Sequence, residues 1–260
     1  MSHPTTCLNC NEKLIGKFCF NCGQKSDTHR ITLKHFLFHD ILHGVWHIDK
    51  GILFTIKEAL TRPGQAALDY IAGKRIRYYN VFYLILILIG LNIFLSNQYD
   101  KMASEYLGTV VDSANAKGKA INDFLTTNSK LIIFLIVPLF ALNSFILFRR
   151  KKLNISEHFI LAGMIYLGIL ILTFIVEILS FLEFIKYGNY ITDYLLLVYL
   201  ILIFTYAVRG YYKTFESNYT KINFTIRILF FLVLLFLEIS FLIILLLGFI
   251  SKWKFGSFQF

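Results

Sequence analysis

Apolar runs with few charges, each long enough or nearly long enough to cross a lipid bilayer, alternate with polar segments along the chain. A helix needs ~20 apolar residues to span the hydrocarbon core of a membrane. The pattern therefore predicts an all-α membrane protein with about five transmembrane helices. The predicted spans are residues 79–96, 130–148, 159–181, 191–208 and 224–250.

A different pattern precedes the first span, in residues 29–78. Apolar residues recur there near helical spacing with polar residues between them, which is typical of amphipathic helices that lie in the membrane interface. The sequence "TRPG" interrupts this region. We expect Thr61 to cap the next helix, Pro63 to begin it and Gly73 to follow its end.

Four histidines in the same region are spaced four residues apart. Successive members drift only ~40° around a helix, so they form a slanted polar stripe. We favour the polar face of an interfacial helix. The alternative is a second metal site or a pH-sensing stripe, because histidines at this spacing can chelate a metal. The four residues are His35, His39, His43 and His47.

Composition supports the membrane class. The chain is 57% hydrophobic with a net charge of +10. In a soluble protein this charge would suggest nucleic acid, but here the basic residues lie beside the predicted spans, where they contact anionic lipid head groups. Nucleic-acid binding is therefore disfavoured, and membrane lipid is an expected partner. The residues expected to contact head groups or a partner are Lys74, Arg75, Arg77, Arg149, Arg150, Lys151 and Lys152.

The basic residues also predict orientation. Most of them precede the first span or lie in the connections between spans two and three and between spans four and five. Basic connections stay in the cytoplasm, so we expect a cytoplasmic N-terminus and an external C-terminus. The first 30 residues have no apolar signal-peptide core, and the first span is expected to drive insertion.

All four cysteines lie near the N-terminus, in the pattern Cys7-x2-Cys10, eight residues, Cys19-x2-Cys22. Two such pairs on tight turns present four thiolates tetrahedrally to one zinc ion. A reducing cytoplasm disfavours disulfides, and a redox site would need a single motif in a βαβ unit. We predict a zinc ribbon with one structural Zn²⁺ per chain. Its role is either docking of a partner or capping of the N-terminus.

Two acids interrupt the predicted spans, Glu177 in the third and Glu238 in the fifth. A charge at the centre of a bilayer costs at least ~2.5–3.5 kcal/mol, so such residues usually face the bundle interior, a partner or a cavity. Asn92, Asn143 and Thr173 are expected to form hydrogen bonds between helices. Glu157 and His158 lie close to the run "RRKK", where a surface salt bridge is the plainest interpretation.

Three stretches resemble a known family: "CLNCNEKLIGKFCFNCGQ", "RITLKHFL" and "TIKEALTRPGQAALDYIAGKRIRYYNVFYLI". They are similar to an uncharacterised bacterial membrane family, domain-of-unknown-function family 3667. The resemblance is strongest over the N-terminal third of the chain, and beyond it only "SEHF" is distinctive. It implies a zinc ribbon fused to a helical domain in the bacterial inner membrane, and it implies no reaction, substrate or catalytic residue.

The expected organisation is a zinc ribbon at residues 1–28, interfacial amphipathic helices at 29–78 and a five-helix membrane domain at 79–260. The sequence contains no HExxH, GxSxG or glycine-rich phosphate-binding motif, so an enzyme is the least favoured class. We expect a non-enzymatic membrane protein whose ribbon and basic face dock or sense a cytoplasmic protein partner. The alternative is a homo-oligomeric channel, transporter or pore-forming effector, for example in bacterial defence, with Glu177 and Glu238 on its path.

Overall fold

The structure is a computed structural model, and it describes residues 5–26, 28, 31, 51–107, 135–185 and 188–250. Regular structure in these ranges is helical, with isolated β-bridges in the cysteine region. The histidine stripe lies outside the described residues. The elements are α2 (Gly51–Thr61), α3 (Pro63–Ile71), α4 (Val81–Leu107), a helix at Leu135–Leu147, the short 3₁₀ turn η2 (Arg149–Lys151), α6 (Ile155–Ser180), the turn η3 (Phe181–Phe184), α7 (Asn189–Phe215) and α8 (Lys221–Ile250).

Four of the described helices are long and apolar enough to cross a membrane, which confirms an all-α protein of the membrane class. These segments are Val81–Glu105, Ile155–Phe184, Tyr194–Phe215 and Lys221–Leu245. The second predicted span is present as the shorter apolar helix Leu135–Leu147, and residues 130–134 fall outside the described ranges.

Two helices extend well beyond their predicted ends. α4 continues through polar residues to Leu107, because helical hydrogen bonds do not require apolar side chains. α7 continues past residue 208 to Phe215, because Tyr211 and Phe215 on its last turns are fully buried in the core.

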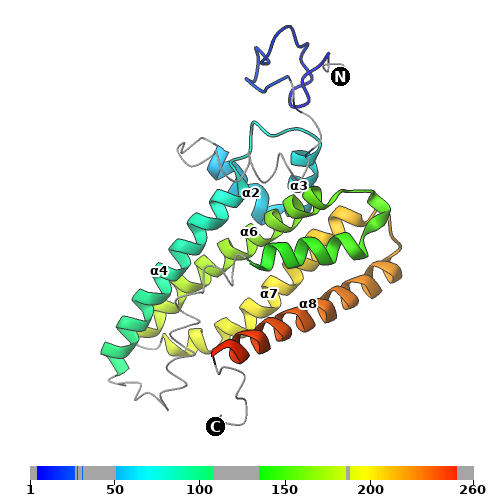
Figure 1. Ribbon diagram of the computed structural model, residues 1–260. Helices are drawn as coiled ribbons and strands as arrows, with labels where there is room; N and C mark the ends of the chain where they lie inside the picture. The colour runs from blue at the N-terminus through cyan, green and yellow to red at the C-terminus, as the bar shows by residue number, and fades with distance from the viewer. Residues whose placement is uncertain are drawn as a thin grey trace.

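α6 is the central helix of the bundle. It packs against α2, α3, α4 and α7, and its first half, including Leu161 and Ile165, is fully buried. A helix that is apolar all round belongs in such a position. Figure 1 shows α4, α6 and α7 running obliquely side by side, with α8 at the edge of the bundle.

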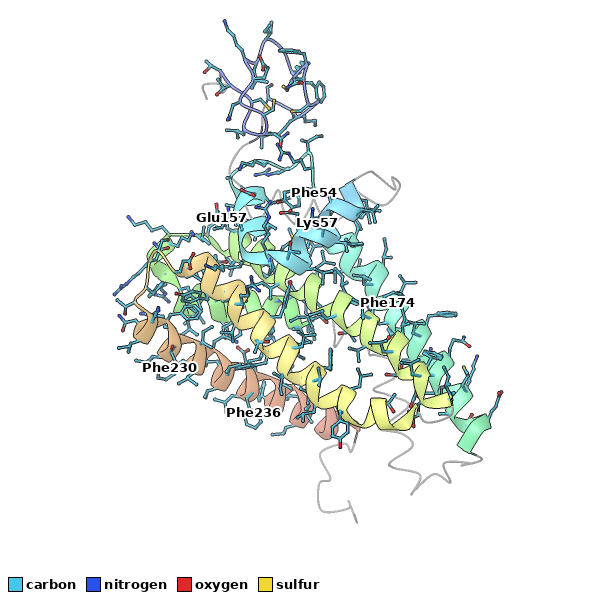
Figure 2. All side chains as sticks on the ribbon, turned by 180° about the vertical axis from the view of Figure 1, so that it is seen from behind. Phe54, Lys57, Glu157, Phe174, Phe230 and Phe236 are labelled. Carbon is cyan, nitrogen blue, oxygen red and sulfur yellow. The ribbon has the colours of Figure 1, made fainter. Side chains whose placement is uncertain are left out.

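The outer faces of α7 and α8 expose large apolar side chains. Leu196 on α7 and Phe236 on α8 are 65% and 70% exposed. Figure 2 shows Phe230 and Phe236 at the outer edge of α8. An apolar surface of this kind suits lipid rather than water. The exposed surface therefore agrees with a multi-pass membrane protein.

α2 and α3 lie at the end of the bundle that also carries the cysteine region, here called the ribbon end (Figure 1). Their apolar faces pack on α6, and α3 also packs on α7. Ala59 on α2 and Ala66 on α3 are completely buried, and the Tyr206 hydroxyl of α7 donates a hydrogen bond to the Ala59 carbonyl. The two amphipathic helices therefore bury one face against the bundle itself.

The boundaries of α3 test three sequence expectations. Pro63 begins the helix, and Gly73 follows its end with a φ of 101°, so both of these predictions are confirmed. The predicted cap at Thr61 is wrong. Arg62 is the N-cap residue, and Thr61 ends α2, where its hydroxyl donates to the Lys57 carbonyl. Arg62 is the single residue between the two helices, so Thr61 still belongs to α2 and cannot cap α3.

The predicted surface position of Glu157 and His158 is also wrong. Glu157 is 2% exposed and accepts a hydrogen bond from the backbone N–H of Asn154 in a capping box at the start of α6. His158 is fully buried, and its Nδ1 lies 2.7 Å from the Ser144 hydroxyl. Both side chains face the bundle because α6 begins inside it, beneath α2 and α3.

Candidate metal centre and its attachment to the bundle

The cysteine region is built from two loops with the same hydrogen-bond pattern. In the first, the N–H of Cys7 donates to the Glu12 carbonyl and the N–H of Asn11 donates to the Cys7 carbonyl, both at 2.8 Å. In the second loop, the N–H of Cys19 donates to the Gln24 carbonyl and the N–H of Gly23 donates to the Cys19 carbonyl, again at 2.8 Å.

These loops are an internal repeat within the cysteine region. The two copies read "CLNCNEK" and "CFNCGQK". Asn11 and Gly23 occupy equivalent positions with φ angles of 62° and 76°, a conformation that Asn and Gly adopt most readily. Isolated β-bridges, Thr6 with Lys13 and Phe18 with Lys25, close the two loops in the same way. The repeat is too short to be conspicuous without its geometry.

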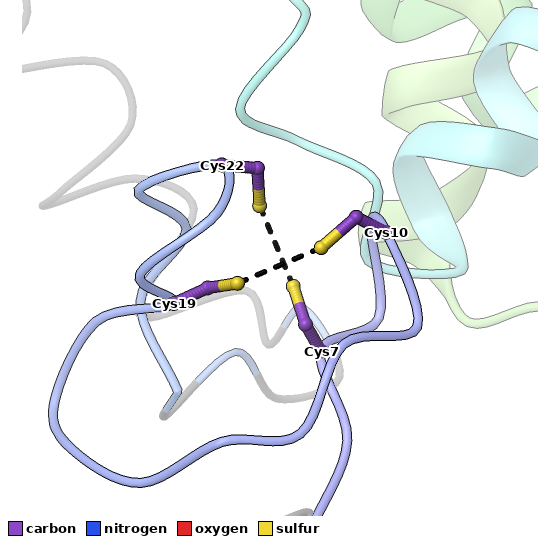
Figure 3. Close-up of side chains that lie close together, drawn as sticks. All are labelled: Cys7, Cys10, Cys19 and Cys22. Carbon is purple, nitrogen blue, oxygen red and sulfur yellow. Dashed lines mark hydrogen bonds between the residues drawn. The ribbon is translucent and has the colours of Figure 1, made fainter.

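The four thiols meet at the centre of this repeat (Figure 3). The Cys7 and Cys22 sulfurs lie 3.6 Å apart, the Cys10 and Cys19 sulfurs lie 3.5 Å apart, and all four lie within 4.8 Å of one another. Four sulfurs around one ion at ~2.3 Å would be separated by ~3.8 Å, whereas a disulfide brings two sulfurs to ~2.05 Å. The cluster therefore fits one tetrahedral metal ion, and the predicted ligand set is brought together.

The surroundings of the thiols shift the pKa values of Cys22 and Cys10 in opposite directions. Burial opposes ionisation of Cys22, but hydrogen bonds from the Asn9 side chain and the Gln24 backbone outweigh it and lower the pKa of Cys22 to about 6. For Cys10 the hydrogen bond from the Glu12 backbone favours the thiolate, yet desolvation and the neighbouring thiols raise its pKa to about 12. Without a metal the cluster thus holds protons that a divalent cation would displace.

The cysteine region is attached to the connection between α3 and α4 through its first loop and through Gln24 of the second. The Leu8 side chain lies against Gly73, where an added Cβ would come within 2.6 Å of the Leu8 Cδ1 atom. The Arg77 guanidinium donates to the Asn9 carbonyl at 3.3 Å, and the N–H of Ile76 donates to the Gln24 side chain at 3.5 Å. These contacts place the metal centre at the ribbon end of the bundle.

The equivalent face of the second loop has a different environment. Phe20 corresponds to Leu8 in the repeat, and it is 72% exposed against 39% for Leu8. Phe18 and Ile15 beside it are also exposed. The two loops are alike in backbone, but only the first packs its apolar side chain on the glycine of the helical domain.

Comparison with known proteins places the attachment in a recognised sequence region. Residues 49–91 match the family described as "Protein of unknown function (DUF3667)". The match confirms the resemblance seen in "TRPG" and "GKRIRYYN", and it covers α2, α3 and the first part of α4. Gly73 and Arg77, which contact the first loop, and Ile76, which contacts Gln24 of the second, all lie inside the DUF3667 match. Neither the curated proteins nor the solved structures contain a match to the chain.

Several of the basic residues expected at head groups have partners within the protein. Lys74 pairs with Asp69 at 3.0 Å, and the Arg75 guanidinium lies over the Tyr70 ring. Lys151 donates to the Thr214 carbonyl at 2.6 Å, and burial lowers the pKa of Lys151. The Arg150 guanidinium donates to the Asn218 carbonyl at 3.4 Å, and the Arg150 backbone N–H donates to the Tyr219 hydroxyl. Arg149 is exposed, and Lys152 has a left-handed backbone conformation. Contact of this set with head groups stays a prediction.

The structure gives the two intramembrane acids separate surroundings. Glu238 on α8 accepts a hydrogen bond from Asn143 at 2.8 Å, which joins α8 to the helix Leu135–Leu147. Glu177 on α6 lines a cavity of about 210 Å³ with Tyr99 and Ser180, among other residues. One of its carboxylate oxygens has no hydrogen-bond partner among the described residues.

The expected polar contacts between helices are present. Asn143 bonds to Glu238 as above, Asn92 donates to the Leu170 carbonyl at 3.4 Å, and Thr173 lies 2.8 Å from the Tyr199 hydroxyl. These bonds join α4 to α6, α6 to α7 and Leu135–Leu147 to α8, so polar residues in the apolar runs connect the helices.

Proposed function

We propose that the chain is a non-enzymatic integral protein of the bacterial inner membrane whose cytoplasmic zinc ribbon docks a protein partner. A closed set of four thiolates leaves no open coordination position for catalysis, and zinc is the metal that prefers this set in tetrahedral geometry. The helical bundle anchors the ribbon in the membrane, with the N-terminus in the cytoplasm.

The asymmetry between two equivalent loops supports docking rather than simple capping. A ribbon that only capped the chain would need attachment alone, and Leu8 and Asn9 of the first loop supply it together with Gln24 of the second. The second loop carries the same fold and exposes Phe20, and Phe18 and Ile15, which precede this loop in the chain, are exposed as well. Exposed aromatic side chains on a rigid scaffold are typical anchors of protein interfaces.

The test is site-specific photo-crosslinking in cells, with the photoreactive residue placed at Phe20 and, as a control on the first loop, at Glu12. Docking predicts a discrete protein adduct from Phe20 that is absent from Glu12. The adduct should disappear in a Phe18→Ser variant that keeps its zinc. Equal labelling from both positions, or no discrete adduct, would leave the ribbon as a cap.

A second candidate, an oligomeric channel or transporter, is favoured by one observation. Glu177 lines a cavity and carries an oxygen without a hydrogen-bond partner in the described part of the chain. An unsatisfied carboxylate is costly in a membrane unless it serves an ion or a proton. Ion flux into liposomes that is lost in Glu177→Gln, but kept in a Glu183→Gln control, would support this function. Absence of ion flux through the wild-type protein would exclude the channel or transporter function.

A further inference from the structure

A basic cavity lies at the ribbon end of the bundle, where α2 and α3 meet α7. Its volume is about 190 Å³. Three cationic residues line it, Arg62 from the α2–α3 junction and Arg209 and Lys213 from α7, against one acid, Glu216. None of these three belongs to the basic run at residues 74–77 or to "RRKK" at residues 149–152.

The helix geometry of α7 explains the gathering of these side chains. Tyr206, Arg209 and Lys213 are three and four residues apart, so they share one helix face. That face is turned toward the start of α3, because Gly210 and Thr214 of α7 both contact Gly64. A separate, apolar cavity lies on the opposite side of α7. It is lined by other residues of this helix, among them Ala207 and Tyr211.

Two of the three cations are held by acids without being neutralised completely. Arg62 pairs with Glu58, whose side chain is only 7% exposed, at 2.6 Å. One carboxylate uses part of a guanidinium that has five N–H donors. Lys213 pairs with Glu216 at 3.0 Å on the surface, and such exposed pairs are worth little. The Arg209 side chain has no ion pair or hydrogen bond in the described residues.

The start of α3 adds donors to the same cavity. Gly64 and Gln65 line it and lie in the first turn, where backbone N–H groups lack helical acceptors. The N-cap residue, Arg62, provides no side-chain hydrogen bond to this turn. The positive end of the helix and the three cations thus favour the same kind of ligand.

We infer that this cavity binds a phosphate group. A phosphate offers several anionic oxygens to guanidinium, ammonium and backbone N–H donors, and bidentate pairing with arginine suits it. Sites for drug-sized molecules occupy ~300–1,000 Å³, so a cavity of about 190 Å³ fits a single head group better than a nucleotide. The phosphate comes either from an anionic lipid, since α7 leaves the apolar part of the bundle here, or from a soluble phosphate compound.

The test compares two double variants that remove the same charge. Arg209→Gln with Lys213→Gln changes the cavity, and both residues are exposed, so the fold should be kept. Lys57→Gln with Lys221→Gln removes two exposed cations outside the cavity. Purified full-length protein in a non-ionic detergent is titrated with phosphatidic acid, phosphatidylcholine or glycerol phosphate, and bound ligand is counted by native mass spectrometry.

Loss of charge-assisted hydrogen bonds should cost about tenfold each, so the cavity variant should bind about a hundred-fold more weakly than the wild type. The control variant should stay within a few-fold. Selective binding of phosphatidic acid over phosphatidylcholine supports the lipid source, and binding of glycerol phosphate alone supports the soluble source. Equal losses in both variants, or no phosphate-dependent binding by the wild type, would overturn the inference.

Discussion

Replacing Gly64 with alanine should loosen the contact between α3 and α7. A Cβ at this position would lie within 3.0 Å of the Gly210 carbonyl oxygen and of the Thr214 hydroxyl, closer than real Cβ contacts come. The Gly210 oxygen belongs to the backbone of α7, so it cannot rotate away. Either helix α3 shifts outward or α7 bends.

Forced overpacking of this kind typically costs about 1–3 kcal/mol. The gain in helix propensity from glycine to alanine offsets at most about 1 kcal/mol of it. We therefore expect a net loss of about 1–2 kcal/mol of unfolding free energy. For a chain of this size that corresponds to a fall in Tm of roughly 2–8 °C.

The assay is thermal unfolding of the purified protein in detergent, followed by intrinsic fluorescence. Gly90→Ala is the matched control, because Gly90 lies inside α4 and an added Cβ there meets nothing within 4 Å. The control should be neutral or slightly stabilising. A Gly64→Ala protein as stable as the Gly90→Ala protein would mean that α3 and α7 do not approach as closely as the structure has them.

Three further predictions concern the metal, the polar contact in the bundle and the membrane topology. Zinc affinity should fall as the pH is lowered, because protons compete with the metal for the four thiolates. A chromogenic chelator measures the release of zinc, and an affinity that does not change with pH would contradict the prediction. Asn143→Ala should lower the unfolding free energy by about 0.6–1.7 kcal/mol. This loss should be smaller in a Glu238→Leu background, because the hydrogen bond between the two side chains is then already absent. Equal losses in both backgrounds would show that the two residues are not coupled. Reporter domains fused at the two ends of the chain should give opposite signals, as an odd number of spans requires, and signals from one side only would mean an even number.

The sequence by itself determined the class of the protein and the four cysteines that could hold a metal ion. Apolar runs of sufficient length fold as helices in lipid whatever their neighbours are, because every backbone group must be satisfied within the segment. The spacing of Cys7, Cys10, Cys19 and Cys22 likewise predicts a shared ion, because each pair sits on a tight local turn. Pro63 and Gly73 marked the ends of α3 for local backbone reasons.

Only the tertiary structure decided which polar residues are buried and what they contact. Glu157 and His158 looked like surface residues because they adjoin "RRKK", yet α2 and α3 cover the start of α6. Glu238 looked like an isolated acid until the Leu135–Leu147 helix placed Asn143 beside it. Both outcomes depend on helices far apart in the chain, which periodicity does not report.

For the ribbon and the basic cavity too, the sequence indicates some features and the tertiary structure decides the others. Sequence spacing found the four thiols, but the equivalence of Leu8 and Phe20 became visible only through matching backbone hydrogen bonds and unequal surroundings. Arg62 and Arg209 are distant in sequence, and each looked like one more basic residue near a span. They line one cavity because Gly64 lets α3 approach Gly210 of α7, a contact between backbones that no local pattern encodes.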